Sequence, residues 1–235
     1  MTDASDLLLM GTRRYSSWSL RAWLAVNLAG LEVREEVIPL RGGGQTEEIH
    51  QRSPNRCVPY LRYHGAEIWE SLAICQFCAG FNAQLWPQSP EAYGRALSLA
   101  AQMHAGFGPL RRAWPMNCGR VFPRADVVDP DVARDLADIE TLLTATRARF
   151  GKGGAYLFGA AFGIADAMFA PVMSRFATYQ VPVSTVLADY RDAVLAHPLM
   201  REWYSRVMEE PSSWQLDRFE FPNGSDPAHE NFNPG

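Results

Sequence analysis

The chain has 235 residues and a formal net charge of −4, from 22 basic and 26 acidic side chains. No long basic run is present, which argues against a nucleic-acid partner held through its phosphates. The four cysteines are too few and scattered for a disulfide framework, and no segment approaches the roughly 18 uninterrupted apolar residues that span a bilayer, so we expect a soluble cytoplasmic protein.

The first elements predicted are a strand, a helix and a second strand. Residues 7–10 form a short apolar run that favours a strand. From Leu20 onward, apolar residues recur at spacings of three and four, which is typical of one face of a helix, and Gly30 favours a C-terminal stop. Residues 33–40 predict the second strand, and residues 41–53 predict a polar loop.

Two further strands and a helix are predicted after that loop. Residues 58–63 and 67–69 have strand composition, and the three residues between them have hairpin spacing. Ser71 is a favourable N-cap for a helix that runs to about Phe81. The first eighty residues therefore predict a βαβ unit followed by a ββα unit.

A proline-rich joint at residues 86–90 marks a change of composition. Beyond it, the pattern predicts helices near residues 91–112, 131–150, 164–179, 185–196 and 198–209. We therefore divide the chain into a first domain at residues 1–84 and an all-helical domain at residues 90–218. Residues 219–235 are rich in Pro, Asn, Gly and Asp, and we expect an extended or disordered tail there.

Residues 15–21, with the sequence YSSWSLR, place three serine hydroxyls at the start of the first helix. A helix N-terminus offers unpaired N–H groups and the positive end of the peptide dipole, so it favours an anion such as a thiolate or carboxylate. Two other segments could face the same groove, namely Val58 with Pro59, and Glu70 with Ser71.

With these segments, the chain resembles the glutathione S-transferase superfamily. The likeness lies in residues 16–21, 53–61 and 68–74, together with a helix-capping segment at residues 162–166 that is followed by Pro171. The resemblance implies a thioredoxin-like α/β domain that binds glutathione, followed by an all-α domain that supplies the co-substrate pocket. It also implies a homodimer.

In serine-using members of this family, a hydroxyl at the first helix N-terminus donates a hydrogen bond to the glutathione sulfur. Position relative to Arg21 favours Ser16 for this role, with Ser17 as the close alternative. Tyr15 is a rival, because some classes use tyrosine. Serine is also a preferred N-cap, so both serines could simply cap the helix.

The resemblance also suggests how the rest of glutathione is held. Ser71 would bind the γ-glutamyl carboxylate and Glu70 the ammonium, while the backbone of Val58 would pair with the cysteinyl unit, which requires a cis bond before Pro59. Gln45 and His50, in the predicted loop, could reach the glycyl carboxylate, although a plain surface location is an equal alternative.

The co-substrate pocket is expected from the first helix of the second domain and from Tyr15. An apolar wall with two arginines would suit an aromatic or anionic electrophile, while the alternative for each residue is core packing or a solvated position. The candidates are Tyr15, His104, Phe107, Arg111 and Arg112.

The sequence departs from the family pattern at Arg56, where a glycine is usual, and at Gly163, where the helix-capping segment has Ser or Thr. Asp166 is therefore expected to bond local N–H groups as a determinant of the fold.

Cys75 and Cys78 have the spacing of a redox motif, but their apolar helix favours inert buried thiols. The histidines form no metal-ligand spacing, so no metal is expected.

The favoured function is a glutathione transferase of the detoxification type that activates the glutathione thiolate through a serine hydroxyl. One alternative is a glutathione-dependent isomerase of the maleylacetoacetate type, whose zeta-class enzymes carry a similar serine segment. Another is a binding protein of the same fold with little turnover.

Overall fold

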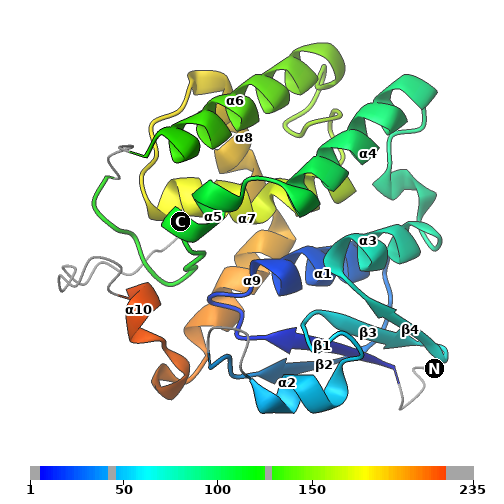
Figure 1. Ribbon diagram of the computed structural model, residues 1–235. Helices are drawn as coiled ribbons and strands as arrows, with labels where there is room; N and C mark the ends of the chain where they lie inside the picture. Colours follow the sequence, from blue (N-terminus) through cyan, green and yellow to red (C-terminus); the bar gives the residue numbers. More distant parts are fainter. Residues whose placement is uncertain (1–5, 42–45, 125–128, 221–235) are drawn as a thin grey trace.

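The computed structural model describes residues 6–41, 46–124 and 129–220, which form two domains packed against one another (Figure 1). The first domain contains β1 (Leu7–Gly11), α1 (Ser17–Leu28), β2 (Arg34–Ile38), α2 (Glu47–Arg52), β3 (Tyr60–Tyr63), β4 (Ala66–Trp69) and α3 (Ser71–Ala79). A 3₁₀ turn, η1 (Ala83–Leu85), leads to the second domain.

The sheet has the strand order β2-β1-β3-β4, with β1 parallel to β2 and antiparallel to β3. Side chains alternate across a strand, so Leu8 and Met10 of β1 join the core that contains α1 and α3. Leu7 and Leu9 face the opposite side, where they pack with Ile49 of α2. Helices therefore cover both faces of the sheet (Figure 1), and the predicted thioredoxin-like domain is confirmed.

The second domain consists of helices and 3₁₀ turns in the residues that the structure describes. They are α4 (Pro90–Ala105), α5 (Gly108–Ala113), α6 (Pro130–Phe150), α7 (Ile164–Thr178), α8 (Thr185–Ala196), α9 (Pro198–Met208), η2 (Ser212–Trp214) and α10 (Asp217–Glu220). Helix α7 lies at the centre and is buried almost throughout. None of the described helices is both long and apolar enough to cross a membrane.

Three sequence predictions about the elements are wrong in detail. Residues 41–53 do not form only a loop, because α2 occupies part of them. The single helix predicted at residues 91–112 is two helices, since Phe107 adopts a left-handed backbone with φ of 55° and α5 starts afresh after it. The expected tail begins inside α10, where the Glu220 side chain is buried by partners from distant segments.

Candidate active site

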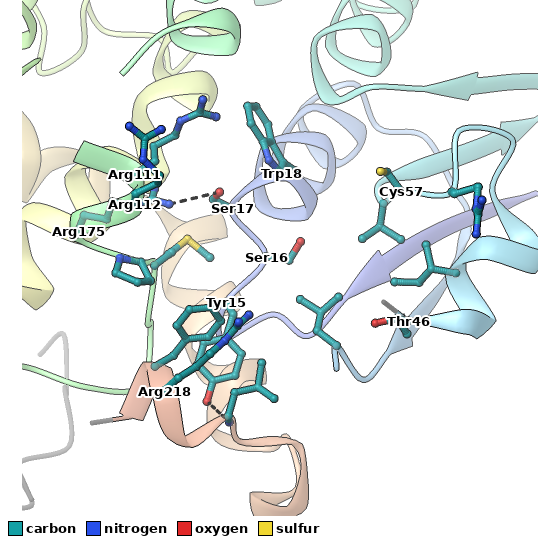
Figure 2. A pocket seen from close by; sticks show the side chains of 18 of the residues that line it. Tyr15, Ser16, Ser17, Trp18, Thr46, Cys57, Arg111, Arg112, Arg175 and Arg218 are labelled. Atoms are coloured by element: carbon teal, nitrogen blue, oxygen red, sulfur yellow. Dashed lines mark hydrogen bonds between the residues drawn. The ribbon is translucent and has the colours of Figure 1, made fainter. Parts of the chain in front are cut away.

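A cavity of about 460 Å³ lies at the N-terminal end of α1, between the two domains (Figure 2). The sequence candidates that line it are Tyr15, Ser16, Ser17, His50, Val58, Arg111 and Arg112. In Figure 2, Ser16 points into the middle of the cavity, with Cys57 and Thr46 on one side and the arginines on the other. The cavity thus joins a groove in the first domain to a wall of the second.

The two candidate serines have different surroundings. Ser16 is the N-cap of α1, and its hydroxyl oxygen accepts a hydrogen bond from the Ser19 N–H at 3.3 Å. Ser16 Oγ also lies 2.8 Å from Ser19 Oγ, to which it donates. Ser17 is the first helical residue, and its Oγ accepts from Arg175 Nη2 at 3.5 Å. Ser16 therefore does cap the helix, as the simpler interpretation predicted, while Ser17 faces the arginines.

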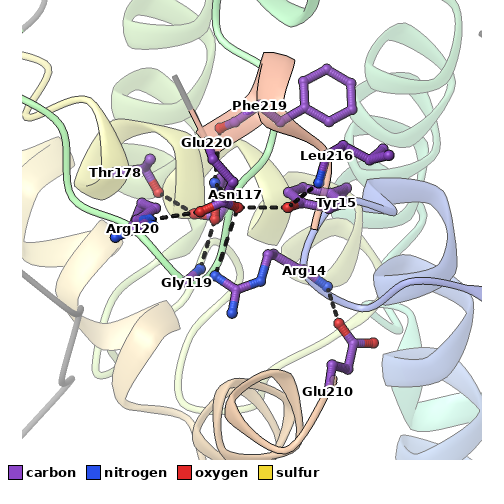
Figure 3. Close-up of polar contacts among 10 residues, drawn as sticks. All are labelled: Arg14, Tyr15, Asn117, Gly119, Arg120, Thr178, Glu210, Leu216, Phe219 and Glu220. Carbon is purple, nitrogen blue, oxygen red and sulfur yellow. Dashed lines mark hydrogen bonds and ion pairs between the residues drawn. The ribbon is translucent and has the colours of Figure 1, made fainter. Parts of the chain in front are cut away.

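The Tyr15 hydroxyl is engaged elsewhere. It donates to Glu220 Oε1 at 2.5 Å and accepts from the Leu216 N–H at 3.1 Å (Figure 3). Burial, followed by the bond to Glu220, raises the pKa of Tyr15 well above its usual value. Glu220 also receives Asn117 Nδ2 and Arg120 Nε. Tyr15 therefore fastens α10 to the edge of the cavity, and its proton is committed to Glu220.

Guanidinium groups dominate the wall that the second domain contributes. Arg175 is buried and donates to Ser17 as described, and also to the backbone oxygens of Trp114 at 2.7 Å and Pro171 at 3.0 Å. Burial lowers the pKa of Arg175 to about 10, so it stays charged at neutral pH. The guanidinium carbons of Arg21 and Arg111 lie 4.5 and 5.1 Å from the centre of the Trp18 ring.

The start of α3 lies close to this site but does not line the cavity. Ser71 is the first residue of the helix rather than its N-cap, which is Glu70 with φ of 68°. Ser71 Oγ is buried and makes no hydrogen bond within the described residues. Glu70 accepts from Asn55 Nδ2 at 3.1 Å and lies 3.8 Å from His104 Nε2. This helix start therefore holds an unpaired hydroxyl next to a carboxylate.

Two family models match this chain. Residues 15–79 match the glutathione S-transferase N-terminal domain, and residues 129–206 match the glutathione S-transferase C-terminal domain. The chain belongs to the glutathione S-transferase family.

Relatives and solved structures agree with this family at low identity. Maleylacetoacetate isomerase of Rattus norvegicus is 24% identical over 176 residues, which cover 72% of this chain and 78% of the isomerase. The tau class glutathione S-transferase from mango superposes with a TM-score of 0.65 at 17% identity, covering 88% of this chain and 97% of that chain. A glutathione transferase homolog from Burkholderia with bound glutathione gives 0.64 at 19% identity, covering 88% and 99%.

Within this glutathione S-transferase fold, other sequence candidates lie outside the cavity lining. His104 packs edge-on against Trp18, with ring centroids 5.4 Å apart. Phe107 is buried against Phe169, so it belongs to the core, which was the alternative interpretation. The Val58–Pro59 peptide bond is cis, as the resemblance required. Gln45 lies outside the described residues.

Sequence reasoning missed several cavity residues. Arg175 comes from α7, and Arg218 and Phe219 come from α10, where the predicted helical domain ends and the expected tail begins. Arg175 is the only charged residue besides Asp166 in the mostly apolar sequence of α7, which was a usable signal. Arg56, the departure from the family's glycine, has φ of 60° and also lines the cavity.

The cysteines and the aspartate singled out in the sequence lie outside the cavity lining. Cys75 and Cys78 are buried in α3 without a disulfide, and burial raises the pKa of Cys78 to about 12, so both are inert core thiols. Asp166 accepts from the Gly163 and Leu157 N–H groups at 2.9 and 3.1 Å, which confirms its role in the fold. No cluster of three or more His, Cys, Asp or Glu side chains suited to a metal occurs among the described residues.

Proposed function

We propose that this protein is a glutathione transferase in which the Ser16 hydroxyl stabilises the glutathione thiolate. The observation that carries the proposal is the place of Ser16 at the N-terminus of α1, where it points into the middle of a cavity that Val58 also lines. A free thiol titrates near 8.5, and lowering its pKa by about two units stabilises the ion by roughly 2.7 kcal/mol. A hydroxyl donor with the helix dipole can supply this energy.

The first-domain side of the cavity and the nearby start of α3 suit the rest of glutathione. The unpaired Ser71 hydroxyl at the start of α3 is a donor for the γ-glutamyl carboxylate, and Glu70 beside it is a partner for the ammonium. The backbone of Val58 would pair with the cysteinyl unit. His50 Nδ1 lies 3.0 Å from Arg56 Nη2, and this pair is a candidate for the glycyl carboxylate. Gln45 remains a candidate from sequence alone.

The reaction we propose is nucleophilic substitution or addition at an electrophilic carbon. The glutathione thiol loses its proton to solvent, the sulfur forms a bond to carbon, and a leaving group departs with its bonding electrons where one is present. Ser16 stays neutral and donates its hydrogen bond to sulfur throughout. The rate gain comes from a larger thiolate fraction and from holding both reactants in one cavity.

The test is the ultraviolet absorbance of bound glutathione thiolate as a function of pH. We expect Ser16→Ala to raise the pKa of bound glutathione by about two units and to lower kcat/KM at neutral pH about 10- to 100-fold. Ser17→Ala, the matched neighbour, should leave this titration in place. If Ser17→Ala abolishes the thiolate band and Ser16→Ala does not, the roles of the two serines are the reverse of those proposed.

The alternative isomerase function has its own support, because maleylacetoacetate isomerases of rat and mouse are each 24% identical to this chain. An isomerase would regenerate glutathione, whereas a transferase consumes it in a stable adduct. Glutathione consumption during turnover of a cis-configured dicarboxylic ketone separates the two functions.

Binding of glutathione with no thiolate band and no turnover would instead indicate a binding protein. A homodimer in the cytoplasm, as is typical of this family, completes the proposal.

A further inference from the structure

Among the residues that the structure describes, the second-domain side of the cavity has several arginines in its lining and no acidic side chain. Arg111, Arg112, Arg175 and Arg218 all line the cavity, whereas no aspartate or glutamate of the described chain does so. None of these arginines lies within salt-bridge distance of a carboxylate in the part of the chain that the structure describes. In the described parts of the chain, the wall is therefore a cluster of guanidinium groups that form no salt bridge.

Arg175 is the most constrained member of this cluster. It is 4% exposed, and each acceptor it reaches is neutral: two backbone oxygens and Ser17 Oγ. A buried charge with only neutral partners is costly to retain unless a ligand of opposite charge compensates it. The Ser17 hydroxyl accepts from Arg175, so its own proton is available for an acceptor in the cavity.

Arg111 provides a second donor on the same wall. Its Nε is buried without a hydrogen-bond partner, and its guanidinium lies over the Trp18 ring. The carboxylate of Asp135 attracts its charge, but Asp135 Oδ2 already accepts a hydrogen bond from the Leu110 N–H. Figure 2 shows Arg111, Arg112 and Arg175 gathered beside Ser17. The arrangement suits a planar anion such as a carboxylate, which accepts two hydrogen bonds from one guanidinium.

The remaining lining of this side is apolar and partly aromatic. Trp18, Pro115, Met116 and Phe219 line it around the arginines. Flat apolar walls favour an aromatic ring, because such rings bury large surfaces and stack on indole and phenyl groups.

Glutathione itself is the competing source of a carboxylate. The position that we propose for glutathione, however, is on the other side of Ser16, where Cys57 and Thr46 lie in Figure 2. We propose that the electrophilic co-substrate is an aromatic carboxylic acid, whose carboxylate is held by Arg111, Arg175 and Ser17 beside the sulfur. This inference rests on the proposed function, since it assumes that glutathione occupies the Val58 side.

The chemistry that would report this site is aromatic substitution. With 4-chloro-3,5-dinitrobenzoate, the glutathione sulfur would bond to the ring carbon that bears chlorine, and chloride would leave with the bonding electron pair. The thiol proton is released to solvent, and the carboxylate stays unchanged on the arginines. The neutral amide, 4-chloro-3,5-dinitrobenzamide, has the same ring and leaving group and lacks only the charge.

The experiment compares enzymatic kcat/KM for this acid and amide, each divided by its uncatalysed rate constant with glutathione. We expect the acid to be favoured about 10- to 100-fold, the size of a charge-assisted hydrogen-bonded pair. Arg175→Met and Arg111→Met should each remove most of that preference, with a smaller effect on the amide. Arg175→Lys should restore part of it. Arg201→Met, an exposed arginine of α9, is the control and should change neither substrate.

Several outcomes would overturn the inference. If wild type shows equal normalised kcat/KM for acid and amide, or if both arginine variants keep the preference for the acid, the proposed anion site is wrong. A normal thiolate band in the same protein would still support the proposed function. If the arginine variants instead weaken glutathione binding, the cluster holds glutathione. If Arg175→Met fails to fold, the acid-to-amide preference of Arg111→Met tests the anion site by itself. If the wild-type protein shows no thiolate band, calorimetry with 3,5-dinitrobenzoate, which has no leaving group, tests the anion site independently.

Discussion

At the scale of single residues, the serine cluster contains a supporting member, Ser19, that does not line the cavity. Ser19 is fully buried, and its hydroxyl oxygen accepts from the Gly11 N–H at 3.1 Å and from Ser16 Oγ at 2.8 Å. To stabilise a thiolate, Ser16 would donate its hydroxyl proton to the sulfur and no longer to Ser19. The Ser19 hydroxyl would then donate its own proton to Ser16 Oγ. Ser19 is therefore a positioning residue for Ser16, connected to the end of β1.

We expect Ser19→Ala to weaken thiolate stabilisation without removing the donor. The loss of one buried neutral hydrogen bond costs about 0.5–1.5 kcal/mol, which raises the pKa of bound glutathione by about half to one unit. The pH profile of kcat/KM measures this shift, which a purely structural role would not produce. Ser98→Ala, on the exposed surface of α4, is the matched control. A pH profile identical to that of the wild type would contradict the prediction.

The site residues that belong to a local helix or strand pattern were predictable, because that pattern is visible in the neighbouring sequence. Ser16 and Ser17 lie at a helix start whose apolar spacing is visible, and Val58 precedes a recognisable strand. The serine capping bond was predicted as an alternative and is present. Arg175 could not be placed, because only the packing of α7 against α1 brings it to Ser17. The engagement of Tyr15 by Glu220 likewise depends on the path of the C-terminal segment.

At the scale of elements, apolar periodicity decided which helices were predictable. Helix α2 has six residues and buries only Ile49, so it has no repeating apolar face to detect. The break between α4 and α5 had a signal in Gly106 and Pro109, since glycine and proline interrupt helices, but the continuous apolar pattern concealed it. Local spacing thus predicts long buried helices and overlooks short exposed ones.

Helix α7 depends on Asp166 at its first turn, and this dependence varies with pH. Asp166 is fully buried and accepts from two backbone N–H groups and from the Tyr190 hydroxyl at 3.0 Å. Burial raises the pKa of Asp166 from 3.8 to about 6, against the opposing effect of these hydrogen bonds. The native state therefore binds this proton more tightly than the unfolded state does. The resulting stabilisation is fully present below pH about 4 and is lost as the pH rises to about 6.

We expect Asp166→Ala to lower the free energy of unfolding at every pH, and to lower it more at pH 4 than at pH 7. The difference between the two pH values should be about 2 kcal/mol, from a pKa shift of about two units of which most is expressed at pH 4. Urea unfolding of wild type and variant at both pH values measures it. Asp189→Ala removes an exposed carboxylate on α8 and corrects for the change in net charge. An equal loss at both pH values would contradict the assignment.

At the scale of the whole molecule, the two domains share one hydrophobic core. Buried residues of β1, α1 and α3 form a single cluster with those of α4, α7 and α9. Polar contacts cross the same boundary: Arg21 Nε of α1 donates to the Met168 oxygen of α7 at 2.8 Å, and Arg206 of α9 pairs with Glu35 of β2 at 2.6 Å. Each domain therefore needs the other to exclude water from this shared apolar surface, and the cavity between them depends on both.

This shared core predicts a single cooperative unfolding transition. Trp203 of α9 is fully buried, and its ring lies 5.3 Å from that of Trp23 in α1. Truncating a buried tryptophan costs about 3–5 kcal/mol, and here the lost contacts belong to both domains. We expect Trp203→Ala to move the midpoints of circular dichroism and tryptophan fluorescence together to lower denaturant. Met208→Ala, on the same helix but 49% exposed, should leave both midpoints nearly unchanged. Two separated transitions in either protein would mean that the domains unfold independently, so that the glutathione groove could persist without the wall that faces it.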